Sequence, residues 1–483
     1  MHPSRPGDDS FREECGVFGI FGHPEAAAHT ALGLHALQHR GQEACGIVAT
    51  DQRMFHSHRG SGLVGDNFSD ASVIEKLRGR AAIGHNRYST SGQNEERNIQ
   101  PMFADYAFGG FALAHNGNLT NAVQLRRDLM ARGSIFGSTS DTEALIHLVA
   151  LSTYTAVPDR LVDAAKQVLG AFSLVALTKD TLIGMRDPYG VRPLILGQLD
   201  DAWLLASESV ALDIIGADVI REIEPGEMVV ITEKGVESFH PFAPQKQRFC
   251  IFEYIYFSRP DSLVEGHSVY EVRKRIGEEL AREAPVDADI VVPVPDSGVP
   301  ASIGYAAEAG LPFELGIIRN HYVGRTFIEP TDHIRHLGVK LKHNANPGTL
   351  SGKRVVLVDD SIVRGTTSTK IVEMVRSAGA TEVHMRIASP PTTNSCFYGV
   401  DTPKREQLLA AMHDLDEMAR IIGVDTLSFI SLDGLYRAVG EPGRNSATPQ
   451  YCDACFTGEY PIELVDHEDG RNPAQLSLLA ESR

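Results

Sequence analysis

The stretch VVLVDDSIVRGTT, residues 355–367, decides the fold of the carboxy-terminal half of this chain. Its first four residues are valine or leucine, which is typical of a strand buried on both faces of a parallel sheet. Two carboxylates, Asp359 and Asp360, follow where that strand ends. A loop of small and hydroxylated residues then leads into a helical pattern over 368–378. This order of elements indicates the carboxyl edge of a parallel α/β sheet.

Such an edge suits a sugar phosphate as ligand. Ligands of open α/β sheets bind at the carboxyl ends of the strands, and loop amides with a helix N-terminus bind a phosphate dianion. The two carboxylates can accept hydrogen bonds from adjacent ribose hydroxyls or help to bind Mg2+. The structural alternative is an acidic cap on an ordinary strand-to-helix turn, but a cap needs only one carboxylate.

This stretch resembles the phosphoribosylpyrophosphate (PRPP) motif of the type I phosphoribosyltransferases. The resemblance implies an α/β domain in which Asp359 and Asp360 position ribose and Mg2+, while residues 364–367 bind the 5-phosphate. The PRPP-binding residues that it implies in this loop are Asp359, Asp360, Ser361, Arg364, Gly365, Thr366 and Thr367.

Length and composition indicate a large, acidic, globular protein. A chain of 483 residues exceeds what one hydrophobic core usually serves, so we expect two large domains. The net charge of −18 argues against partners such as nucleic acids or anionic membranes. No apolar run approaches the length of a membrane span, and residues 1–14 lack the apolar core of a secretory signal. We therefore expect a cytoplasmic enzyme.

A second kind of chemistry begins at Cys15. Residues 1–14 are polar and charged, and the strand-like segment CGVFGIFG follows them directly. A reactive thiol needs a base, and an N-terminal amine with a pKa of ~7.7–8.0 can be that base on the same residue. Cys15 gains such an amine only if residues 1–14 are removed, so we expect them to be a propeptide. The alternative is that Cys15 is simply a small buried residue.

Four motifs follow Cys15 at fitting intervals. They are LQHRGQEACGI (37–47), GHNRYSTSG (84–92), HNGNLTN (115–121) and SDTE (140–143). Together with the Cys15 strand they resemble the glutamine amidotransferase domain of the N-terminal-nucleophile (Ntn) hydrolases, over roughly residues 15–242. The resemblance implies a layered α+β fold of the αββα type, with Cys15 as the nucleophile.

The same resemblance implies how glutamine is bound. Arg87 would bind its α-carboxylate, for which a bidentate guanidinium is well suited, and Asp141 would bind its α-ammonium group. Asn116 and the N–H of Gly117 would form the oxyanion hole, in which each donor is typically worth ~10²–10³ in rate. Taken one by one these residues could be an ordinary ion pair and an ordinary Asn-Gly turn.

We divide the chain into four parts. They are a propeptide (1–14), a glutamine amidotransferase domain (15–245), a phosphoribosyltransferase domain (246–470) and a polar tail (471–483). The resemblance to the transferases assigns pyrophosphate binding to Ser297 and Gly298, and a contact with the metal to Ser297. We expect residues 319–336 to form a lid over the pyrophosphate, with Arg325 as a PRPP contact.

The six cysteines of so long a chain do not make a disulfide framework. Four lie far from the glutaminase motifs: Cys250, Cys396, Cys452 and Cys455. Four thiolates suit a [4Fe–4S] cluster or structural zinc, and unligated buried thiols are a third possibility. A resemblance to one subgroup of the glutamine PRPP amidotransferases implies the iron–sulfur cluster, in a structural or oxygen-sensing role.

The two halves combine into one reaction, because residues 15–460 resemble the glutamine PRPP amidotransferases. Ammonia released from glutamine would attack C1 of PRPP as Mg2+-bound pyrophosphate leaves, giving 5-phosphoribosylamine for purine synthesis. Because free ammonia is protonated and lost in bulk water, we expect lid closure to form a conduit between the two sites. The resemblance also implies inhibition by purine nucleoside monophosphates and assembly as a homotetramer.

Two other functions would account for part of this pattern. An enzyme similar to glucosamine-6-phosphate synthase would share the glutaminase motifs, but its sugar isomerase domain needs neither the Asp359–Asp360 pair nor the lid. A PRPP-sensing regulator without catalysis would not need the pyrophosphate loop or a processed Cys15.

Overall fold

The computed structural model describes residues 15–88, 96–320 and 343–467. The predicted propeptide, the predicted tail and the lid residues 321–336 lie outside these ranges. Arg325 lies outside them as well, so its contact with PRPP and the conduit expected from lid closure stay predictions. Of the helices in the described ranges, none has both the length and the apolar character that crossing a bilayer requires.

The amino-terminal half contains two antiparallel sheets, one of seven strands and one of six. In spatial order, the first consists of β11 (Asp218–Glu222), β9 (Ile195–Leu199), β10 (Ala202–Ala206), β1 (Gly16–Phe21), β4 (Ala81–Arg87), β2 (Ala44–Thr50) and β3 (Phe55–Ser61). The second consists of β13 (Gly235–Phe239), β12 (Met228–Thr232), β8 (Leu182–Arg186), β7 (Gly170–Leu177), β6 (Gly109–Leu119) and β5 (Met102–Tyr106).

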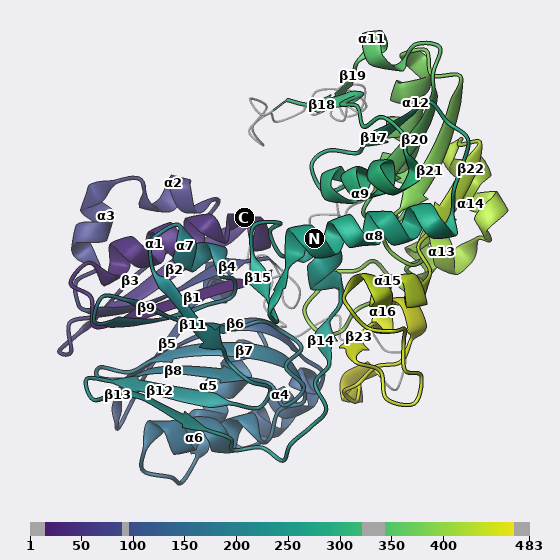
Figure 1. The fold of residues 1–483 in the computed structure, drawn as a ribbon. Helices are drawn as coiled ribbons and strands as arrows, with labels where there is room; N and C mark the ends of the chain where they lie inside the picture. The colour runs from purple at the N-terminus through teal and green to yellow at the C-terminus, as the bar shows by residue number, and fades with distance from the viewer. Residues whose placement is uncertain (1–14, 89–95, 321–342, 468–483) are drawn as a thin grey trace, which may run out of the picture.

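Helices cover the outer face of each sheet, so that the half has four layers (Figure 1). On the first sheet lie α1 (Ala26–Ala36), α2 (Val64–Phe68), α3 (Ala71–Lys76) and α7 (Val210–Asp213), and on the second α4 (Ala122–Ala131), α5 (Thr142–Leu151) and α6 (Val157–Ala165). Strand β1 shows why the layers form. Phe18 and Ile20 pack in the cluster below α1, whereas Val17 and Phe21 pack between the sheets, as the period-2 alternation of a strand requires.

The carboxy-terminal half is built on a four-stranded parallel sheet. Its strands in spatial order are β17 (Ile290–Pro293), β20 (Arg354–Asp359), β21 (Glu382–Ile387) and β22 (Thr426–Phe429). Its helices are α8 (Val269–Glu283), α9 (Val299–Ala309), α11 (Pro347–Leu350), α12 (Thr366–Ser377), α13 (Leu409–Met412), α14 (Leu415–Ile422), α15 (Leu432–Ala438) and α16 (Ala454–Thr457). Three small sheets pair β14 (Phe249–Cys250) with β23 (Tyr451–Cys452), β15 (Leu263–Val264) with β16 (His267–Ser268), and β18 (Ile317–Arg319) with β19 (His343–Ala345).

Strand β20 confirms the prediction of a strand buried on both faces. Its residues 355–358 are all fully buried, and it pairs with β17 on one side and β21 on the other. Val356 and Val358 pack with the α8 and α9 side of the sheet, while Val355 and Leu357 pack with the α12 side. Both faces of the strand are therefore covered, and this accounts for the unbroken apolar run.

A buried ion-pair network joins the two halves. Arg40, 1% exposed in the 3-10 turn Gln38–Arg40, donates through Nη1 to Glu208 Oε1 at 2.6 Å and through Nη2 to Glu253 Oε1 at 2.7 Å. Burial alone would raise the pKa of Glu208, but the charges of His39 and Arg40 hold it well below the usual range. The resulting stabilisation is present above the ordinary glutamate range and is lost as the pH falls toward the lowered pKa.

Replacing Arg40 by alanine should destabilise the fold strongly. The substitution leaves Glu208 and Glu253 buried beside the gap, and breaking a buried pair in this way costs about 3–5 kcal/mol. We expect the midpoint of thermal unfolding to fall by on the order of 10 °C.

Arg282→Ala is the matched control for this measurement. Arg282 pairs with Glu279 at 2.6 Å and Glu308 at 2.8 Å, but its side chain is 48% exposed. Because exposed pairs contribute about 0–1 kcal/mol, its midpoint should change by no more than about 3 °C. Equal shifts for the two variants would contradict the assignment of stability to the buried network.

Candidate functional site

Cys15 lies directly before β1, near the middle of the first sheet. Its side chain is buried, and the thiol donates to the backbone oxygen of Tyr88 at 3.5 Å. Burial raises the pKa of the Cys15 thiol to about 11. The thiol is therefore protonated near neutral pH, and a reaction that uses the thiolate requires a base close to it.

Two other residues predicted for the glutamine site lie near this thiol. Strand pairing places Gly16 opposite Asn86, so that Arg87, buried at the end of β4, comes next to Cys15. Asp141, just before α5, accepts a hydrogen bond from the Leu119 N–H at 3.0 Å. After burial and the Tyr88 bond, the charges of Arg87 and Asp141 have the next largest effects on the pKa of Cys15. The fold thus brings together one cation and one anion beside the thiol.

The predicted oxyanion residues lie on β6. Asn116 is fully buried, and neither polar atom of its side chain has a hydrogen-bond partner among the described residues. Leaving such groups unpaired costs about 1–3 kcal/mol each, and a bound substrate or an ordered water that pairs with them would recover that cost. Gly117 has φ +142°, and a Cβ there would lie 2.0 Å from the backbone oxygen of Ala171. Only glycine fits at that position.

The carboxyl edge of the parallel sheet brings the predicted PRPP residues together. Asp359 and Asp360 are both buried, and the Asp360 N–H donates to Asp359 Oδ1 at 2.9 Å. Ser361 Oγ donates to Asp360 Oδ1 at 3.2 Å, whereas Asp360 Oδ2 has no partner within the described ranges. The edge therefore presents a buried carboxylate oxygen that can bind a ligand or a cation.

The two PRPP loops predicted from separate motifs meet at this edge. Strands β17 and β20 pair in parallel, with Pro293 opposite Val358. The loop after β17 contains Ser297 and Gly298, and a Cβ on Gly298 would lie 2.5 Å from the backbone oxygen of Val358. The absence of a side chain at Gly298 lets this loop lie directly against the end of β20.

The predicted phosphate loop precedes α12. Gly365 is the residue before the helix and Thr366 is its first residue, so Thr366 and Thr367 stand at its N-terminus, where helices bind phosphate. Arg364 donates through Nη2 to Gln407 Oε1 at 3.3 Å. The structure thus places residues 364–367 at a helix N-terminus, as the predicted binding of a phosphate requires.

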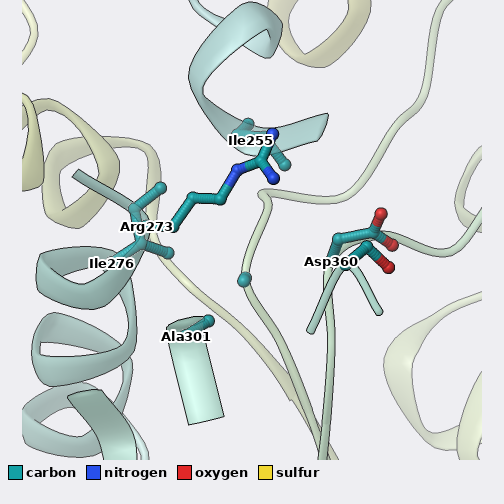
Figure 2. Close-up of a pocket in the computed structure, with 7 residues that line it drawn as sticks. Ile255, Arg273, Ile276, Ala301 and Asp360 are labelled. Carbon is teal, nitrogen blue, oxygen red and sulfur yellow. The ribbon is translucent and has the colours of Figure 1, made fainter. Parts of the chain in front are cut away.

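Arg273 faces the same edge and was missed by the sequence analysis. Together with Ile255, Ser297 and Asp360 it lines a pocket. Arg273 reaches this pocket from α8, and Asp360 reaches it from the end of β20 (Figure 2). Arg273 is 4% exposed and donates to the backbone oxygens of Tyr254 and Ser258. Burial lowers the pKa of Arg273 to about 10, so the guanidinium remains charged at neutral pH.

Burial also raises the pKa of Asp360, while the positive charge of Arg273 opposes that rise. A signal for Arg273 was present in the sequence. It stands on the helical face that Val269, Val272 and Ile276 bury, and a charged residue within an apolar stripe usually has a specific partner.

The four distant cysteines converge in the fold. Cys250 and Cys452 are paired residues of β14 and β23, and the backbone oxygen of Cys455 accepts hydrogen bonds from the N–H groups of Thr393 and Asn394 at 3.1 and 3.0 Å. Burial, and then the charges of Cys250, Cys396 and Cys452, raise the pKa of Cys455 well above its usual value. These mutual effects show that the thiols are neighbours, and all four are free of disulfides.

Four converging thiolates suit either structural zinc, with Zn–S bonds of about 2.3 Å, or a [4Fe–4S] cluster. Within the described part of the chain, the group of side chains whose potential ligand atoms all lie within 4.8 Å of one another is Glu224, Glu227 and His240, and it contains none of these thiols. Either metal centre would use the same four cysteines.

The glutamine amidotransferase domain family matches residues 85–213, and the phosphoribosyl transferase domain family matches residues 261–389. The amidophosphoribosyltransferase of Rhizobium etli is 56% identical over 478 residues, which cover 98% of this chain and 96% of that protein. The chain belongs to the amidophosphoribosyltransferase family. The Bacillus subtilis amidophosphoribosyltransferase is 49% identical over 453 residues, 94% of this chain and 95% of that protein.

Solved structures of amidophosphoribosyltransferases confirm the predicted fold class. The B. subtilis glutamine PRPP amidotransferase complexed with ADP and GMP superposes with a TM-score of 0.88 at 48% identity, covering 93% of this chain and 98% of that one. A structure described as the allosteric regulatory enzyme of purine biosynthesis gives a TM-score of 0.89 at 48% identity, with 93% and 97% coverage. Both halves of the chain therefore have the fold that the motifs predicted.

This family membership confirms the predicted activity. As an amidophosphoribosyltransferase, the protein converts PRPP to 5-phosphoribosylamine, glutamate and pyrophosphate with ammonia from glutamine, at the first step of purine nucleotide synthesis. Glutamine and PRPP are its substrates. The matches extend over nearly the whole chain, which excludes both the glucosamine-6-phosphate synthase-like enzyme and the non-catalytic regulator.

Proposed function

We propose that Cys15 is the nucleophile that hydrolyses glutamine, and that removal of residues 1–14 activates it. The buried thiol has a pKa of about 11, so a nearby base must take its proton. The α-amine created by cleavage lies on the same residue and has an ordinary pKa of ~7.7–8.0. The charged pair Arg87 and Asp141 beside this thiol is the observation that carries the proposal, and the buried, unpartnered Asn116 side chain supports it.

Each polar group of this site then has a role. Arg87 binds the α-carboxylate of glutamine and Asp141 its α-ammonium group. The Cys15 sulfur attacks the amide carbon while its proton passes to the α-amine, and Asn116 with the Gly117 N–H stabilises the oxyanion. The α-amine returns the proton to the leaving nitrogen, which departs as ammonia, and water hydrolyses the glutamyl thioester.

At the transferase site we propose that Asp359, Asp360 and Ser297 hold Mg2+, for which hard oxygen donors are the appropriate ligands. The unpartnered Asp360 Oδ2 supports this assignment. When bound, the ion neutralises charge on the pyrophosphate as it leaves. Residues 297–298 bind the pyrophosphate, while residues 361 and 364–367 bind the 5-phosphate at the α12 N-terminus. Neither carboxylate acts as a base, because ammonia is already nucleophilic.

We further propose a [4Fe–4S] cluster on Cys250, Cys396, Cys452 and Cys455. The convergence of the four thiols supports it. Such a cluster would crosslink three segments of the chain, around Cys250, Cys396 and Cys452–Cys455, and make the fold sensitive to oxygen. Assembly as a homotetramer and a cytoplasmic location belong to the same proposal and rest on the sequence analysis.

Cys15→Ser should separate the two ammonia sources. We expect glutamine-dependent activity to fall by at least about 10³-fold, because the nucleophile is lost. Activity with added ammonium should remain within about twofold, because the PRPP site is unchanged. Formation of phosphoribosylamine from each source measures both values.

Cys45→Ala is the control, since Cys45 is also a fully buried cysteine of this half. It should keep both activities within a few-fold. Intact-mass analysis shows whether the chains of a preparation begin at Met1 or at Cys15. We expect only preparations whose chains begin at Cys15 to use glutamine. Equal use of glutamine by the uncut chain would overturn the role of the α-amine.

Metal analysis should distinguish the cluster from zinc. Protein purified without oxygen should contain about four iron atoms and about four sulfide ions per chain. Cys455→Ser should lose most of this iron, whereas Cys45→Ala should retain it. One zinc ion per chain and no iron would contradict the proposal.

Purine nucleoside monophosphates are proposed inhibitors, since they share the ribose and 5-phosphate of PRPP. The B. subtilis relative was solved in complex with ADP and GMP, which supports nucleotide binding. GMP should raise the apparent KM for PRPP, and saturating PRPP should restore the full rate. A rate that stays reduced at saturating PRPP would instead indicate that GMP binds only at a separate site.

A further inference from the structure

A segment of the transferase half packs on the strand that carries the predicted oxyanion hole. Asn118 of β6 donates through Nδ2 to the backbone oxygen of Phe397 at 2.9 Å. A Cβ on Gly399 would lie 3.1 Å from Gly117 Cα and 3.2 Å from its carbonyl carbon. Residues 397–399 thus contact the two residues that follow Asn116 in β6.

A methyl group on Gly399 would fit only if Gly117 shifted by a few tenths of an ångström. Gly399 has φ +116°, and the separations above are shorter than the 3.5–4.0 Å at which carbon atoms pack favourably. Gly117 is confined more tightly toward β7, where a Cβ would lie 2.0 Å from the Ala171 oxygen. The backbone of Gly117 therefore has close backbone neighbours on both β7 and the transferase segment.

Hydrogen bonds hold the segment itself in place. Arg192, fully buried in the glutaminase half, donates through Nε and Nη2 to the backbone oxygen of Tyr398 at 2.9 and 2.8 Å. The Tyr398 hydroxyl donates to the Ile462 oxygen at 2.7 Å. The Cys396 N–H donates to Thr402 Oγ1 at 2.7 Å. Hydrogen bonds to both halves therefore hold the segment, in which Tyr398 and Gly399 are buried.

We propose that residues 397–399 position the oxyanion hole, so that the transferase half completes the glutaminase site. The Gly399 backbone limits where Gly117 can lie, and the Phe397 oxygen restrains Asn118 in the next position. The inference rests on the proposed roles of Asn116 and Gly117. It predicts that a substitution at residues 397–399 of the transferase half lowers the rate of glutamine hydrolysis and leaves the PRPP site unchanged.

Gly399→Ala tests this inference in the full-length, processed enzyme. The added methyl group would press on Gly117 and displace its N–H. We expect kcat with glutamine to fall about 10- to 100-fold, part of the full effect of an oxyanion donor. The KM for glutamine should stay within about twofold, because oxyanion contacts form in the transition state and not with the bound substrate. Activity with ammonium should also stay within about twofold.

Gly440→Ala is the matched control. Gly440 has φ +98° and no atom within 4 Å of the position of a Cβ, so the same substitution adds backbone strain without a contact. Its kcat with glutamine should match that of the unaltered enzyme. Gly399 stands three residues after Cys396, so the iron content of Gly399→Ala is measured alongside. It should equal that of the control.

A second variant, Asn118→Ala, removes the bond to Phe397 without adding bulk, and its kcat with glutamine should fall about 3- to 10-fold.

Asn116→Ala serves to test the proposed function itself. If Asn116→Ala lowers kcat with glutamine but Gly399→Ala and Asn118→Ala do not, the support by residues 397–399 is wrong. If Asn116→Ala has no effect, the oxyanion assignment is wrong. Equal losses with glutamine and ammonium in Gly399→Ala would also overturn the inference.

Discussion

The Arg40 guanidinium lies between two buried carboxylates from opposite halves of the chain, Glu208 and Glu253, at 2.6 and 2.7 Å. Its Nε also donates to the backbone oxygen of Cys15 at 3.4 Å. Glu253 begins the π-helical turn that contributes Ile255 to the pocket beside Asp360. One charged group therefore links the start of β1 to a wall of the pocket beside Asp360. A neutral residue at this position would remove this cation from two buried carboxylates, leaving Glu208 with His39 and Glu253 with Arg192 as partners.

Both sites keep buried polar atoms that the described residues do not satisfy. The Asn116 side chain in the glutaminase half and Asp360 Oδ2 in the transferase half are the examples that matter for the chemistry. Folding around the interface and the two cores must offset their cost. A substrate can then form hydrogen bonds with these atoms, or a cation can coordinate the carboxylate oxygen, without first displacing a protein partner, which is the basis of preorganised binding.

The converging cysteines would tie distant segments together if they held a common ligand. Cys250 opens the transferase half, Cys452 and Cys455 lie near its end, and Cys396 precedes the segment that touches β6. A ligand that held all four thiols would brace this part of the half-to-half contact. Such an arrangement links the integrity of the cysteine site to the geometry of the glutaminase site, although the two are different chemically.

The sequence by itself determined whatever depends on neighbours along the chain. The buried strand at 355–358, the acidic pair after it and the loop before α12 are all local, as are the glutaminase motifs around Arg87 and Asn116. The tertiary structure alone decided which distant groups meet: Arg273 with the PRPP edge, Arg40 with Glu253, and Gly399 with Gly117. Such contacts come from packing between elements far apart in the chain, and no local pattern of residues encodes the packing partner.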